Sequence, residues 1–195
     1  MIKILSFLSI CRFGLRVGPG ILGSLSVVSG LLINNHFRTK LKLGSYGRFS
    51  TYLPIVVIPA IMTTVFHKVL VQSDIILRKY DCPVCLQTRA AVIQCGFGVV
   101  YPLILGPLAS FMFATRHFTY RLPSIIEQPK EIIKLWYKFT KSASSTGSIL
   151  LFANLMAAMF ITYREINEHH KISLELYEVE KKYENDMEES EMLRN

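Results

Sequence analysis

Four long apolar blocks separated by basic stretches are the feature that most restricts how this 195-residue chain can fold. A helix needs about 20 mostly apolar residues to cross the hydrocarbon core of a membrane. The blocks at 17–35, 51–71, 90–113 and 146–163 approach or reach that length. Only 18% of the residues are charged, against about 25% in an ordinary soluble domain. The sequence therefore predicts an all-α membrane protein with four transmembrane helices.

Charge divides the chain into three parts. Residues 1–16 are basic and contain no acid, which is typical of an organellar targeting segment; the alternative is that the apolar stretch at 4–11 begins a secretory signal. Residues 17–163 form the predicted four-span membrane domain, and residues 164–195 form a tail that holds ten of the fourteen acids. The basic side chains of the membrane domain flank apolar blocks, so they indicate headgroup contacts and topology rather than nucleic-acid binding. We expect no nucleic-acid partner.

The distribution of Lys and Arg between the loops predicts the orientation. The loops at 36–50 and 115–145 carry ten of these residues, whereas the N-terminal segment and the loop at 72–89 carry six. Positively charged loops tend to stay on the inner side of a membrane. Both termini are therefore predicted to lie outside.

A C-x-x-C pair, Cys82 and Cys85, lies in the second loop. This spacing occurs in thiol redox centres and in half of many zinc sites. A zinc site needs four ligands, and the same loop holds neither a second such pair nor a histidine pair, so we expect no metal and no cofactor. The open readings are a local disulfide, reduced thiols that fix a turn, and a thiol redox centre.

Polar residues inside predicted spans are costly and are candidates for function. His67 and Lys68 lie near the end of the second span, where we expect both to reach the interface along their apolar stems. Gln94 and Asn154 are expected to form hydrogen bonds between helices, and Asn34 is the remaining polar residue. No chain of acids or histidines marks an ion path, and no phosphate-binding or nucleophile motif appears, so we expect no enzyme activity.

A helical pattern at residues 129–141 separates charge from apolar side chains. At 100° per residue, one arc holds Lys130, Lys134, Lys138 and Lys141, and the opposite side holds Ile132, Leu135, Trp136 and Phe139. This predicts an interfacial amphipathic helix that contacts anionic lipid such as cardiolipin, with Trp136 at the acyl boundary. The alternative is a helix packed on its own bundle.

The acidic tail keeps helical spacing and is predicted to continue the fourth span. Its apolar stripe consists of Ile172, Leu176, Val179 and Tyr183. A partner or another loop of the chain is expected to cover the stripe. The alternative is a partly frayed, solvated tail.

Several short motifs resemble, in order and spacing, those of the transmembrane protein 126 family. They extend over about half of the chain, and they are Asn34 with Phe37-Arg38, Leu53-Pro54, Ile58-Pro59 with Thr63-Thr64, Asp81-Cys82-x-x-Cys85 with Thr88-Arg89, Tyr101-Pro102, and Arg116 with Leu122-Pro123. The C-x-x-C is more similar to the branch of the family that retains both cysteines.

The resemblance implies a non-catalytic, chaperone-like assembly factor for the membrane arm of respiratory complex I. Its partners would be membrane-arm subunits and other assembly factors, and its location the mitochondrial inner membrane. The termini and the cysteine loop would then face the intermembrane space, where a Cys82–Cys85 disulfide is compatible with the oxidising conditions. Two alternatives stay open, a membrane thiol oxidoreductase using the C-x-x-C and a permanent accessory subunit of a respiratory complex. A small channel or carrier is the least favoured reading.

Overall fold

The computed structural model describes residues 2–79, 82–117, 129–142, 144–192 and 194, with side chains from residue 14 onward except that of Pro129. These residues form helices and turns, and no strand occurs among them. The helical elements are α1 (Ile2–Lys40), α2 (Arg48–Tyr52), η1 (Leu53–Val57), α3 (Ile58–His67), η2 (Lys68–Gln72), α4 (Ser73–Ile76), α5 (Pro83–Cys95), η3 (Gly96–Val100), α6 (Tyr101–His117), α7 (Pro129–Ser142) and α8 (Ser144–Met192). The predicted all-α class is confirmed.

Four helical segments are long and apolar enough to cross a membrane. They are Gly14–Lys40, Arg48–Ile76, Pro83–His117 and a span within Ser144–Met192. Each contains one of the predicted spans and extends past it. The tail does continue the fourth span, since α8 runs without a break for 49 residues.

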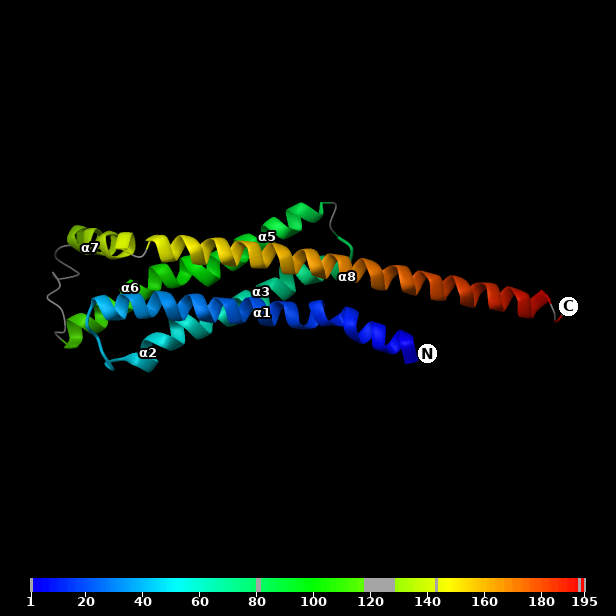
Figure 1. Cartoon of the computed structure of the whole chain (residues 1–195), viewed down its shortest axis with the longest axis horizontal. Helices are drawn as coiled ribbons and strands as arrows, with labels where there is room; N and C mark the ends of the chain where they lie inside the picture. The colour runs from blue at the N-terminus through cyan, green and yellow to red at the C-terminus, as the bar shows by residue number, and fades with distance from the viewer. Residues whose placement is uncertain (1, 80–81, 118–128, 143, 193, 195) are drawn as a thin grey trace.

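The four segments alternate in direction, so both ends of the chain lie at the same end of the bundle (Figure 1). Helix α1 packs against α3, α6 and α8, and α5 packs against α8. Helix α7 lies at the opposite end, in line with the start of α8 (Figure 1). The C-terminal end of α8 projects beyond the N-terminal end of α1 and the other helices (Figure 1).

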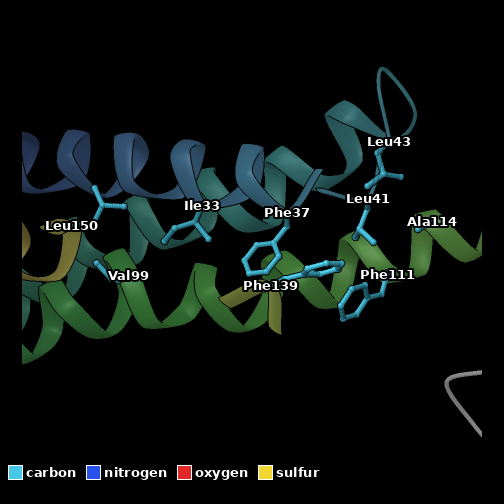
Figure 2. Close-up of a cluster of buried hydrophobic side chains, with 9 residues drawn as sticks. All are labelled: Ile33, Phe37, Leu41, Leu43, Val99, Phe111, Ala114, Phe139 and Leu150. Atoms are coloured by element: carbon cyan, nitrogen blue, oxygen red, sulfur yellow. The ribbon is translucent and has the colours of Figure 1, made fainter. Parts of the chain in front are cut away.

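The largest apolar core lies at the end of the bundle that holds α7. Figure 2 shows its buried members, which are Ile33, Phe37, Leu41, Leu43, Val99, Phe111, Ala114, Phe139 and Leu150. Leu41 and Leu43 belong to the turn after α1, so this turn is fixed to the bundle by two fully buried side chains.

The second and third spans are interrupted by three π-helical segments. In each segment the next residue donates its N–H to a carbonyl five positions back, as Tyr101 does to Gly96 after η3. Such turns in a helix are associated with kinks and with functional sites. Pro54 lies in η1 and has no N–H to donate, so a regular α-helical turn is interrupted there.

Candidate functional site

The bundle has polar side chains inside and apolar side chains outside. Fully buried polar residues come from all four spans: Ser26, Ser29, Asn34, Thr63, His67, Gln94, Ser110, Asn154, Thr162 and Glu165. Large apolar residues on the same helices are exposed, among them Ile61, Val92, Ile104, Phe152 and Phe160. This arrangement suits lipid, which solvates apolar surface and leaves polar groups to pair between helices.

A polar layer near the middle of the bundle joins all four spans. Gln94 donates from Nε2 to Asn154 Oδ1 at 2.7 Å, so the predicted hydrogen bonding between helices is confirmed. Asn154 in turn donates to Ser29 Oγ at 2.8 Å. The hydroxyls of Ser26 on α1 and Thr63 on α3 lie 3.1 Å apart, so the second span also belongs to the layer. Bonds of this kind contribute about 0.6–1.7 kcal/mol each in membrane proteins.

A second polar cluster, which the sequence did not predict, joins three spans nearer the end of the bundle that holds the termini. The fully buried carboxylate of Glu165 on α8 lies 3.0 Å from His67 Nε2 on α3. Gln72 of η2 donates from Nε2 to the other carboxylate oxygen at 2.8 Å. The expectation that His67 extends to the interface is wrong, because its ring is fully buried against Glu165. Lys68 is exposed, as expected.

The π turn explains how His67 and Gln72 reach the same carboxylate. Hydrogen bonds of a π turn join residues five apart, so side chains five positions apart face nearly the same direction. At the α-helical period, Gln72 would point well away from His67. A periodicity search at 3.6 residues per turn therefore misses the pair.

Gln72 also binds a backbone carbonyl that α1 leaves free. Pro19 lies inside α1 and has no N–H, so the carbonyl four residues earlier, that of Leu15, has no α-helical donor. Gln72 Nε2 donates to this oxygen at 2.7 Å. The same amide thus ties α1 and α8 to the second span.

Two glycines of α1 make room for carboxylates of α8. A Cβ at Gly18 would collide with the Glu165 carboxylate, and one at Gly14 with that of Glu168. The Gly14 N–H donates to Glu168 Oε2 at 2.9 Å, and Arg164 lies 3.7 Å from the other oxygen of Glu168. Glu165 and Glu168 therefore hold the start of the predicted tail against α1.

The signal for Glu165 was present in the sequence. Leu150, Asn154, Ala158, Thr162 and Glu165 follow one another at steps of three and four residues, and all are buried on α8. Extending this face of the fourth span past Tyr163 would have placed Glu165 inside the bundle rather than in the tail.

The cysteine loop carries free thiols. Cys82 is the residue before α5, and its sulfur accepts the backbone N–H of Cys85 at 3.4 Å. Both cysteines are exposed and unbonded, so the disulfide stays a prediction, and Asp81 lies outside the described residues. Hydrogen bonds from the side chain and backbone of Cys85 lower the pKa of the Cys82 thiol. No three His, Cys, Asp or Glu side chains gather into a metal site in the described part of the chain.

Helix α7 packs its apolar face on the bundle. Ile132, Leu135, Trp136 and Phe139 contact the large core, and Trp136 Nε1 donates to the Leu103 carbonyl at 3.5 Å. The lysines of the opposite side, Lys130, Lys134, Lys138 and Lys141, are exposed. The packing agrees with the alternative of a helix on its own bundle. Lipid contact by the lysines and by Trp136 stays a prediction.

The tail stripe is uncovered among the described residues. Leu176, Val179 and Tyr183 are 60%, 40% and 69% exposed, and Ile172 is half-buried. The stripe continues the face that carries Asn154 and Glu165, at the same helical steps. The face that packs on the bundle within the membrane therefore continues past it as an apolar stripe that is largely exposed among the side chains that the structure describes.

These features define the class: an α-helical protein that crosses the membrane several times, with its spans joined by buried polar layers. The sequence profile of the transmembrane protein 126 family matches residues 11–182. Transmembrane protein 126 of Drosophila melanogaster is 47% identical over 173 residues, which cover 88% of this chain and 78% of that protein. The chain therefore belongs to the transmembrane protein 126 family, and the resemblance of the short motifs is confirmed.

Two more distant relatives also carry the family name. Transmembrane protein 126A of Mus musculus is 26% identical over 149 residues, covering 76% of this chain and 72% of the relative. The protein of the same name from Rattus norvegicus is 25% identical over the same shares of each chain. No solved structure matches the chain significantly.

Proposed function

We propose that this protein is a non-catalytic assembly factor of the mitochondrial inner membrane that holds membrane-arm subunits of respiratory complex I (NADH:ubiquinone oxidoreductase). The resemblance of the short motifs supplies the location and the client. The main support for a holding function is the uncovered face of α8, which begins inside the bundle and continues beyond it.

Helix α8 has exposed apolar surfaces both within its membrane span and beyond the bundle. Its exposed residues within the span include Ile149, Phe152, Met156 and Phe160, which face lipid and are available to a newly inserted helix. Past the bundle, the stripe with Leu176, Val179 and Tyr183 suits an amphipathic helix or a hydrophobic groove of a partner. Because Asn154 and Glu165 fix α8 to the other spans, a client bound at the tail is held at a set position above the membrane domain.

The experiment is recovery of the tagged protein from mitochondria in mild detergent, followed by native gel separation and quantitative mass spectrometry. We expect the tagged protein to co-migrate with membrane-arm subunits in sub-complexes and to be absent from finished complex I. Recovery at one copy per finished complex would instead make it an accessory subunit. Recovery without any respiratory subunit would contradict both readings.

The exposed C-x-x-C supports a second candidate function, that of a membrane thiol oxidoreductase. Cys82 and Cys85 are free thiols at a helix start, and the pKa of Cys82 is lowered, as in reactive cysteines. A variant with both Cys82→Ser and Cys85→Ser separates the candidates. An assembly factor keeps most of its function, whereas an oxidoreductase loses it.

A further inference from the structure

The turn between α1 and α2 encloses a cavity lined by cations at the end of the bundle that holds α7. The cavity measures about 420 Å³ and is lined by Asn35, Arg38, Thr39, Lys42, Gly44 and Arg48. No carboxylate is among the lining residues. The first acid of the sequence, Asp74, lies on α4 at the other end of the bundle. Positive charge is thus concentrated in a concave surface whose described lining residues include no acid.

Arg38 is a buried cation whose described partners are all neutral. It is 5% exposed and donates to Thr51 Oγ1 at 3.0 Å and to the carbonyls of Gly44 and Tyr46 at 2.9 Å. A guanidinium has five N–H donors, so two are left over from these three bonds. A buried charge is normally paired, and an anion in the cavity would provide the missing partner.

Lys42 occupies a backbone position that favours glycine. Its φ is +53°, and the N–H groups of Lys42 and Leu43 close the end of α1 by bonding to the carbonyls of Thr39 and Arg38. This is the left-handed helix ending in which glycine is the usual residue. Leu41 and Leu43 are buried on either side, while Lys42 is exposed at the cavity. The chain places a cation here despite the steric penalty.

Exposed apolar side chains follow Arg48, one of the cavity-lining residues, in the sequence. Phe49 and Leu53, which follow Arg48, are 92% and 61% exposed on a helix that enters the membrane. The Tyr52 hydroxyl donates to Asn35 Oδ1 at 2.7 Å, which leaves the Asn35 amide hydrogens available to an anion. Cations beside exposed apolar side chains match a charged headgroup with its acyl chains.

We propose that this cavity binds a phosphate group, supplied in the membrane by an anionic phospholipid. Arg38 and Arg48 are the planar donors suited to phosphate oxygens, and Lys42 adds a point charge at the mouth. The proposal does not rest on the assembly function, because the turn between α1 and α2, which lines the cavity, and the uncovered tail lie at opposite ends of the bundle (Figure 1).

The decisive variant is Lys42→Gly, because it removes the charge while relieving the backbone. The chain offers a matched control in Arg78, whose φ is +51° and which closes the end of α4 by the same pair of backbone bonds. Arg78→Gly therefore removes one positive charge and relieves the same backbone conformation at the other end of the bundle. Both variants should fold at least as stably as the parent chain.

The test measures retention of phosphatidylglycerol by the detergent-purified full chain in native mass spectrometry, with phosphatidylcholine as the zwitterionic comparison and inorganic phosphate as competitor. We expect preferential retention of phosphatidylglycerol, weakened about fivefold by Lys42→Gly and unchanged by Arg78→Gly, since a basic residue near a headgroup contributes roughly 1 kcal/mol.

The outcomes separate the sources of the phosphate. If inorganic phosphate binds in a Lys42-dependent way without a preference for phosphatidylglycerol, the cavity is a site for free phosphate. If the binding of neither ligand depends on Lys42, or if Arg78→Gly weakens binding equally, the ligands are attracted only by the net charge of the protein. The proposal is then overturned.

Discussion

Glu165 shows how a single residue decides where the membrane domain ends. Its carboxylate is fully buried, accepts from Gln72 Nε2 and lies 3.0 Å from His67 Nε2, although its neighbour Arg164 is exposed. A carboxylate in such a place is destabilising unless its hydrogen bonds are made. The bonds it makes fix α8 to the second span.

Removal of Glu165 is therefore expected to destabilise the bundle. Glu165→Ala removes the carboxylate partner of the buried His67 ring and of one amide hydrogen of Gln72, which should lower the free energy of unfolding by at least about 2 kcal/mol. Glu165→Gln keeps one acceptor oxygen and should cost less. Unfolding in detergent measures the effect. Glu178→Ala, at an exposed position on the same helix, is the control. Equal stability of the two alanine variants would show that the buried hydrogen bonds of Glu165 do not stabilise the bundle.

Cys82 is expected to be the more reactive thiol of the C-x-x-C. A lowered pKa means that its thiolate persists to lower pH than that of an ordinary cysteine, so alkylation should stay fast as the pH falls towards neutrality. Cys85→Ala removes the side-chain donor and should shift the pH profile of Cys82 alkylation upward, with a several-fold slower reaction at neutral pH. A profile that does not move would show that Cys85 has no influence on Cys82.

At the level of elements, the close approach of α1 to the second span depends on glycine. A Cβ at Gly30 would lie 2.9 Å from the Ile55 carbonyl oxygen in η1, and backbone has little freedom to move away. Gly20, on the same helix, has nothing within 4 Å of its Cβ position. The two glycines thus differ in packing while sharing a helix.

Alanine at these two positions is expected to have opposite effects. Gly30→Ala should destabilise the protein by about 1–3 kcal/mol through steric overlap. Gly20→Ala should be neutral or stabilise by up to about 1 kcal/mol through helix propensity. Thermal unfolding of both variants in the same detergent makes the comparison. Similar losses at both positions would show that α1 and η1 do not approach as closely as described.

The elements were predictable from the sequence to different degrees. Apolar block length identified the four spans and the continuation of α8, because lipid requires long apolar helices whatever their packing. The π turn at η2 was not predictable, since five-residue spacing of His67 and Gln72 matches no regular pattern. The buried position of Glu165 was not predictable from its charge, because an acidic side chain normally indicates an aqueous segment, and its burial depends on the partners on α3 and η2.

On the scale of the whole molecule, the four candidate spans alternate in direction, so both termini lie at one end of the bundle, and the turn between α1 and α2 and helix α7 lie at the other (Figure 1). The excess of Lys and Arg in the loops at 36–50 and 115–145 then predicts which end lies inside. In a mitochondrial inner membrane, the basic end would face the matrix and the tail would extend into the intermembrane space.

Protease treatment of mitoplasts tests this orientation. A tag at the C-terminus should be degraded once the outer membrane is opened, while a matrix protein in the same sample stays intact. Protection of the tag in intact mitoplasts would reverse the topology, and it would place the uncovered tail stripe in the matrix.

The holding function is tested most directly by site-specific photo-crosslinking from the tail. A photoreactive residue at Val179 lies on the uncovered stripe, and one at Lys181 lies about 200° away on the same helix, at 100° per residue. We expect crosslinks from Val179 to capture membrane-arm subunits of complex I in assembly intermediates, and crosslinks from Lys181 to capture far less. Equal capture from both faces, or no respiratory subunit from Val179, would contradict the holding function.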